Sequence, residues 1–134
     1  MVVAHSVIVP IRSSADVVRV RQATRENAIA QGFGLVDQTK LVTAASELAR
    51  NTLDYGRGGE VEIARVGEPT RRGLRLRFTD HGPGIPDIEQ ALRDGYSSGN
   101  GLGLGLGGAR RLSNEFSIDS RAGVGTCVII TRWR

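Results

Sequence analysis

Residues 97–108 read SSGNGLGLGLGG, a stretch in which six glycines alternate with leucine and asparagine. Glycine costs about 0.5–1 kcal/mol relative to alanine inside a helix or strand, so this run favours neither element. Residues 109–112 suit a helix, which we expect to begin where the glycines end. A side-chain-poor loop that leads into a helix exposes backbone N–H groups at a positive dipole end, and this arrangement suits a phosphate. The run by itself fits a mobile linker equally well.

Three familiar schemes for binding phosphate do not fit this run. A Walker loop needs a lysine directly after its last glycine, but the only lysine is Lys40, inside an expected helix. Gly103, Gly105 and Gly108 match the spacing G-x-G-x-x-G. A dinucleotide-binding fingerprint must follow a strand directly, however, and residues 94–98 do not resemble one. The H-R-D and D-F-G motifs of eukaryotic-type protein kinases are absent from the sequence.

The composition narrows the class of protein further. The chain has 134 residues, a length typical of one domain, and no apolar run approaches the ~20 residues of a membrane span. Cys127 is the only cysteine, so an internal disulfide is excluded and a cytoplasmic location is expected. The net charge is +4, but the arginines are dispersed and aromatic residues are scarce, which disfavours nucleic-acid binding. An arginine-rich surface suits an acidic protein partner at least as well.

Local patterns predict strands and helices in separate blocks. The expected strands are residues 7–11, 60–66, 74–78, 116–120 and 126–132. The expected helices are residues 14–31, 37–55, 86–93 and the segment that starts at 109. Pro10 places the first strand at a sheet edge or end. Asp37 is the expected cap of the second helix, and Pro86 is the expected first residue of the short helix. The predicted fold class is α+β, with one mostly antiparallel sheet and helices packed on one of its faces.

The second expected helix carries a first group of candidate site residues. Glu47 and Asn51 are four residues apart and share a helix face, which Asp54 extends by another turn. A carboxylate beside a carboxamide can serve as a general base and a Mg²⁺ ligand. Taken alone, an ordinary polar helix edge accounts for these residues better.

Two turns carry the remaining candidates. Residues 80–84 read DHGPG at a strand end, where the glycines would let the backbone approach a flat ligand and Asp80 would accept from an exocyclic amine. Residues 123–126 read GVGT just before the last expected strand. Taken alone, an aspartate-capped turn accounts for the first segment better than a ligand site, and an ordinary hairpin turn accounts for the second.

Together, four segments resemble the N, G1, G2 and GT boxes of the GHKL ATP-binding superfamily, which includes gyrase B, Hsp90 and histidine kinases. They are ELARN at 47–51, D-x-G-x-G at 80–84, G-x-G-x-G at 101–105 and GT at 125–126. The boxes follow the family's order, and the resemblance covers essentially the whole chain. A lone domain of this kind resembles the bacterial anti-sigma-factor serine/threonine protein kinases, and most of all the stressosome switch kinases. The resemblance implies a Bergerat-type sandwich, formed by residues 1–134 as a single domain.

The resemblance also assigns roles to individual residues. Asn51 would bind the Mg²⁺ that bridges the ATP phosphates, and Glu47 would accept the proton of an attacking hydroxyl. Asp80 would pair with the adenine amino group, assisted by Thr126, while residues 86–100 would correspond to the ATP lid. The other implied ATP-binding residues are Asp54, Gly82, Gly84, Gly101, Gly103, Gly105 and Leu106.

The implied activity is phosphorylation of a serine or threonine on a STAS-domain partner protein, in a bacterial stress-signalling pathway that works by partner switching. ATP and Mg²⁺ are the implied cofactors, and on release the kinase would bind and activate a phosphatase. The alternative is a nucleotide-dependent anti-sigma factor that sequesters a sigma subunit. Both roles use the same fold, and the sequence leaves both open.

Overall fold

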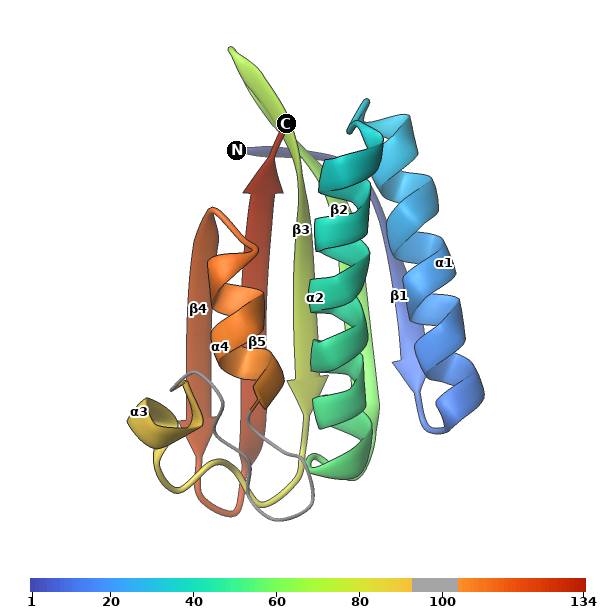
Figure 1. Ribbon diagram of the computed structural model, residues 1–134. Coiled ribbons are helices and arrows are strands. Elements are labelled where there is room, and N and C mark those ends of the chain that lie inside the picture. The colour runs from blue at the N-terminus through green and yellow to red at the C-terminus, as the bar shows by residue number, and fades with distance from the viewer. Residues whose placement is uncertain (93–103) are drawn as a thin grey trace.

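Five antiparallel strands form the sheet, in the order β1-β2-β3-β5-β4 (Figure 1). The computed structural model describes residues 1–92 and 104–134. The strands are β1 (Val2–Ile11), β2 (Gly59–Glu68), β3 (Arg71–Asp80), β4 (Glu115–Arg121) and β5 (Gly125–Trp133). Both predicted hairpins are confirmed, because β2 pairs with β3 and β4 pairs with β5 in antiparallel register.

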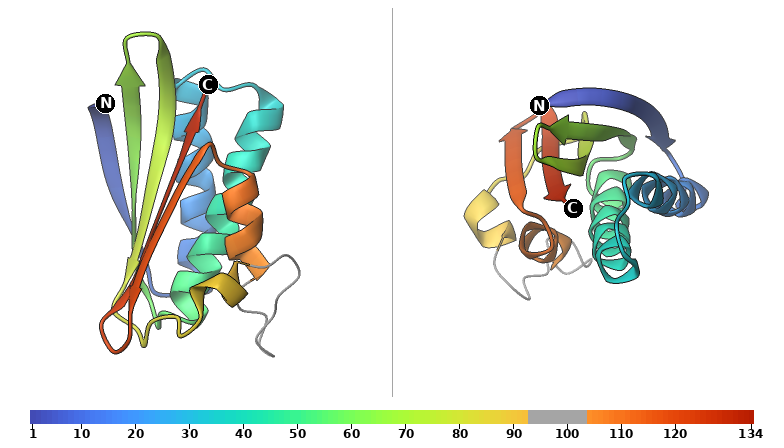
Figure 2. Two further views of the ribbon diagram at one scale, coloured as in Figure 1. Left: turned by 90° about the vertical axis from the view of Figure 1, so that its left-hand side faces the viewer. Right: turned by 90° about the horizontal axis from the view of Figure 1, so that it is seen from above.

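The helices of the described chain all lie on one face of the sheet (Figure 2). They are α1 (Ser14–Ala30), α2 (Leu35–Asp54), α3 (Ile88–Ala91) and α4 (Leu104–Arg111). Helix α2 runs along the middle of the sheet, with α1 beside it on the β1 side and α4 on the β4 side (Figure 1). The predicted α+β class and the one-sided helical layer are therefore confirmed. None of the helices described is long and apolar enough to cross a membrane.

Helix α2 supplies the central contact between the two layers. Its apolar positions recur at three- and four-residue intervals, and they turn toward the sheet and α1 as expected. These buried positions are Leu41, Val42, Ala44, Ala45, Leu48, Ala49 and Thr52. On the sheet side, Ile63, Leu76 and Phe78 complete the core. Of the polar residues beside this stripe, Glu47 and Asp54 are exposed and Asn51 is half-buried.

Strand β1 is longer than the sequence pattern indicates. Residues 7–11 were the expected strand, but pairing with β2 extends it to Val2, which lies opposite Gly67. Residues 2–6 need no alternating apolar pattern to form a strand here, because β2 is long enough to offer their backbone groups hydrogen-bond partners. Pro10 lies in the edge strand, as expected for a residue without an N–H group.

Two helix starts differ from the expected ones. Asp37 is not the N-cap of α2: the cap is Gly34, and Asp37 sits in the first turn, where its Oδ1 accepts from Arg132 at 2.8 Å. Pro86 does not open the short helix either. Asp87 is the N-cap of α3, and its carboxylate accepts from the backbone N–H of Gln90 at 3.0 Å. The Asp37 carboxylate is thus engaged by Arg132 rather than by a helix start, and the residue after Pro86 supplies the cap of α3.

The start of α1 matches the expected position. Ser13 is the N-cap, and the carboxylate of Asp16 in the first turn accepts from the backbone N–H of Arg12 at 2.8 Å. This hydrogen bond, with a smaller contribution from Arg19, lowers the pKa of the Asp16 carboxyl. The charged carboxylate therefore sits where the helix dipole also favours it.

Helix α4 begins inside the glycine run rather than after it. The expectation was a helix from residue 109, but the structure starts it at Leu104 and includes Gly105, Gly107 and Gly108. The side chains of Leu106 and Ala109 are almost fully buried in the core that α4 forms with α2. Burying a leucine side chain contributes about 1.5–3 kcal/mol, which offsets much of the glycine cost.

Candidate functional site

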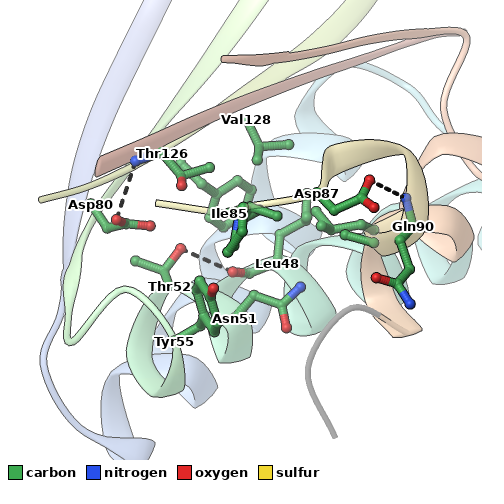
Figure 3. A pocket seen from close by; sticks show the side chains of 14 residues that line it. Leu48, Asn51, Thr52, Tyr55, Asp80, Ile85, Asp87, Gln90, Thr126 and Val128 are labelled. Atoms are coloured by element: carbon green, nitrogen blue, oxygen red, sulfur yellow. Dashed lines mark hydrogen bonds between the residues drawn. The ribbon is translucent and has the colours of Figure 1, made fainter. Parts of the chain in front are cut away.

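A pocket lies at one end of the sheet, between α2 and the short helix α3 (Figure 3). Its walls are largely apolar, with a few polar groups directed inward. The lining residues are Leu48, Asn51, Thr52, Tyr55, Phe78, Asp80, Ile85, Pro86, Asp87, Gln90, Ala91, Leu106, Thr126 and Val128. A mostly apolar cleft with few polar groups is typical of a site for a flat organic ligand.

Asp80 is the charged group at the inner end of this pocket. It is the last residue of β3 and is only 9% exposed. Its Oδ1 accepts from the backbone N–H of Gly82 at 2.9 Å and from that of Thr126 at 3.2 Å. Among the described residues both hydrogen bonds end on this one oxygen. Oδ2 is therefore left for a donor from a ligand.

Two glycines make room for Asp80, because a side chain at either position would overlap it. A Cβ atom on Gly56 would overlap the Asp80 carboxylate, and one on Gly125 would overlap the Asp80 carbonyl oxygen. Gly125 also has φ of +141°, which other residues rarely adopt. The GT box thus contributes Gly125 as a spacer for Asp80 as well as Thr126 as a pocket residue. Gly56 was not expected, because its role depends on two segments that are distant in the sequence.

We expect Gly56→Ala to weaken nucleotide binding strongly, because the new methyl group must displace the Asp80 carboxylate. The matched control is Gly67→Ala, since a Cβ atom at Gly67 meets nothing within 4 Å. Calorimetric titration with ATP measures the effect, and thermal unfolding reports any loss of stability. Wild-type affinity in Gly56→Ala would show that the position of Asp80 does not control binding.

Gly82 and Gly84 shape the turn that follows Asp80. A Cβ atom on Gly82 would come within 2.8 Å of Gly56 Cα, and one on Gly84 within 2.6 Å of the Arg121 carbonyl oxygen. Neither glycine lines the pocket. Close packing against protein backbone therefore explains why both positions are glycine, and this reason was not evident from the sequence. Their contact with a bound base stays a prediction.

Asn51 brings an unpaired amide to the opposite side of the pocket. Its Nδ2 atom is buried and has no hydrogen-bond partner among the described residues. Leaving a buried donor unpaired costs about 1–3 kcal/mol, so a ligand acceptor there would be stabilising. Rotating the carboxamide by half a turn presents its oxygen instead, which is a normal Mg²⁺ ligand. The residue fits either a phosphate or its metal ion.

The remaining candidates lie around the pocket or beyond it. Leu106 and Thr126 line it, and their contact with ATP stays a prediction. Glu47 and Asp54 are exposed on α2 and do not line it, although Glu47 is one turn from Asn51. Gly105 lies in the first turn of α4, while the predictions for Gly101 and Gly103 fall outside the described residues. The sequence reasoning missed several lining residues, which only the fold brings together: Thr52, Tyr55, Phe78, Ile85 and Gln90.

Taken together, these groups suit ATP better than a generic hydrophobic ligand. The apolar walls suit a purine, Asp80 Oδ2 suits its amino group, and Asn51 suits phosphate or Mg²⁺. Residues 36–133 match the family described as "Histidine kinase-, DNA gyrase B-, and HSP90-like ATPase". The chain belongs to this ATPase family, which confirms the resemblance found in the four boxes.

A close relative places the chain within that family. This chain is 45% identical over 125 residues to the serine/threonine-protein kinase RsbT of Bacillus subtilis (strain 168), and the match covers 93% of this chain and 94% of that relative. At this identity and coverage the chain is grouped with the RsbT-type serine/threonine-protein kinases, in agreement with the expected enzyme class.

Solved structures share the fold at low sequence identity. The RsbU and RsbW domains of Rv1364c from Mycobacterium tuberculosis align with a TM-score of 0.67 and 19% identity over 98% of this chain. This chain spans 33% of the length of that one. A chain of the SiaB–SiaC complex from Pseudomonas aeruginosa aligns with a TM-score of 0.57 and 14% identity, covering 98% of this chain and 91% of its own. Such distant similarities support the fold alone.

Proposed function

We propose that this chain is an Mg-ATP-dependent kinase that phosphorylates a serine or threonine on a STAS-domain partner protein. The observation that carries the proposal is the Asp80 carboxylate, held by two backbone N–H groups with one oxygen left for a ligand, in a close relative of RsbT. We further propose that residues 1–134 act as one cytoplasmic ATP-binding domain in a stressosome-type pathway.

In this proposal the two ends of the pocket have different tasks. Asp80 and the apolar walls hold the adenine, while Asn51 faces the phosphates. Bound Mg²⁺ would neutralise phosphate charge, which is a main requirement of phosphoryl transfer. The glycine run and the start of α4 would hold the phosphates through backbone N–H groups.

Glu47 is the proposed general base. It lies on α2 one turn before Asn51, and its exposed carboxylate is accessible to a protein substrate. The substrate hydroxyl oxygen forms a bond to the γ-phosphorus as the bond from that phosphorus to the ADP oxygen breaks. The hydroxyl proton goes to Glu47. Because the Glu47 carboxylate lies outside the pocket lining, it can act on the protein substrate without contacting the bound adenine.

A transfer assay tests the kinase proposal directly. We expect wild-type protein with γ-labelled ATP and Mg²⁺ to label one STAS-domain protein from a panel of purified candidates, on serine or threonine. Glu47→Gln serves as the matched inactive enzyme, and EDTA as the control without metal. Capture of a sigma factor without any labelled protein would instead favour the anti-sigma role and contradict the kinase assignment.

Partner switching predicts a second consequence of the same transfer. We propose that phosphorylation of the STAS-domain partner releases the kinase, which then binds and activates a phosphatase. The dispersed arginines on the exposed surface would suit acidic protein partners. Co-purification of the kinase with each partner before and after phosphorylation would show whether release accompanies transfer.

A further inference from the structure

Three polar side chains form a row across three strands at the inner end of the pocket. Ser120 on β4 lies opposite Thr126 on β5, and Thr126 lies opposite Asp80 on β3. Thr126 and Asp80 line the pocket, whereas Ser120 stands one strand farther from it. Ser120 belongs to none of the four sequence boxes.

Two short contacts fix the Ser120 hydroxyl. Its Oγ accepts from the backbone N–H of Ile85 at 2.7 Å and lies 2.9 Å from Thr126 Oγ1. A serine hydroxyl has one proton to donate, and Thr126 Oγ1 is the acceptor that the described residues place within reach of it. The contact is compatible with either hydroxyl as the donor, and the arrangement in which Ser120 donates to Thr126 is the one that gives the Ser120 proton an acceptor among the described residues. Thr126 lines the pocket (Figure 3), and in this arrangement its own hydroxyl proton is left for a ligand acceptor.

The resulting pair of groups is complementary to one purine rather than the other. Asp80 offers an acceptor, and Thr126, held as described, offers a donor beside it. Adenine presents an amino donor flanked by ring-nitrogen acceptors, whereas guanine presents a carbonyl oxygen at the position of that amino group. If Thr126 were free to reverse its hydroxyl, the second half of this discrimination would be lost. A site with mismatched polar groups rejects a ligand because buried groups are left unpaired.

We propose that Ser120 is a positioning residue that holds the Thr126 hydroxyl as a donor and thereby sets the preference for ATP over GTP. The inference deepens the proposed function and rests on ATP being the nucleotide bound. Ser120 also ties the pocket residue Ile85 to the β4–β5 hairpin, which the bond from Gly123 N–H to the Pro83 carbonyl reinforces at 3.0 Å. Base recognition and the loop that leads to α3 thus share one hydroxyl.

The test compares ATP and GTP affinities by calorimetric titration in a small set of variants. In Ser120→Ala, we expect ATP affinity to fall by about 2- to 12-fold, the range for one ordinary hydrogen bond, and the ATP-to-GTP preference to shrink with it. Ser120→Thr keeps the hydroxyl and should retain the wild-type preference. Ser117→Ala is the matched control, because Ser117 is exposed on the same strand.

The outcomes separate positioning from mere support of the fold. If Ser120→Ala lowered ATP and GTP affinity by the same factor, Ser120 would only anchor the Ile85 loop, and the proposal would be overturned. Should that variant fold poorly, Ser120→Cys retains the side-chain size with a much weaker donor, and the same loss of preference is expected. If wild-type protein bound neither nucleotide, the proposed function itself would fail, which the wild-type titration shows before any variant is compared.

Discussion

Asp80→Asn should lower the affinity for ATP by about 10- to 150-fold, the equivalent of the roughly 1.5–3 kcal/mol of a hydrogen bond to a charged group. The reason lies in how the carboxylate is held. Oδ1 accepts from Gly82 and Thr126, and an asparagine oxygen can keep both bonds. The asparagine amide then replaces Oδ2 and turns a donor toward the adenine amino group, which is itself a donor. Binding is lost although the turn is preserved.

Calorimetric titration gives the affinity, and a base analogue sharpens the interpretation. Purine riboside triphosphate lacks the amino group, so wild-type protein should prefer ATP to it, and Asp80→Asn should lose that preference. Asp119→Asn is the control, because the Asp119 side chain is exposed on β4. Equal ATP affinity in Asp80→Asn and wild type would refute the assignment of Asp80 to the amino group.

Regular periodicity explains the part of the fold that could be predicted from sequence. The buried stripe of α2 repeats over several turns, and the strands of both hairpins alternate over enough residues to define their inner faces. The errors at the two helix starts have different causes. Asp37 pairs with Arg132, which lies 95 residues away in sequence, instead of capping α2, and at α3 the cap is Asp87, one residue after the expected Pro86.

The glycine run shows where local propensity stops being informative. Its composition argues against a helix, yet α4 starts at Leu104 because Leu106 is buried in the core against α2. No property of the run alone reveals that burial. The prediction that the helix begins only after the last glycine was wrong, because it did not account for this tertiary contact. The phosphate contacts of Gly101 and Gly103 stay predictions.

Only the site residues that belong to a sequence motif could be predicted. The boxes identified Asn51, Asp80 and Thr126, and the fold places all three on one pocket. Gly56 and Ser120 carry no motif, since each acts through a residue on another segment: Gly56 through the Asp80 carboxylate, and Ser120 through strand register. A one-residue shift of that register would turn Ser120 away from Thr126. Such roles require the three-dimensional structure.

Glu47→Gln should lower the rate of phosphotransfer by about 10²- to 10⁴-fold, the usual contribution of a general base. ATP affinity should change little, because the Glu47 side chain is exposed and lies outside the pocket lining. The substitution keeps the size of the side chain and removes only the proton acceptor. Single-turnover transfer to the unphosphorylated STAS-domain partner, alongside calorimetric titration with ATP, separates the two quantities.

Glu60→Gln provides the matched control, since it makes the same chemical change at an exposed position on β2. A base role also predicts that the defect of Glu47→Gln lies in the transfer step at saturating ATP, not in the concentration of ATP needed to reach it. Near wild-type transfer by Glu47→Gln would remove Glu47 as the base. A parallel loss of ATP affinity would instead show that its carboxylate acts in nucleotide binding, and would require the phosphate end of the site to extend along α2 beyond Asn51.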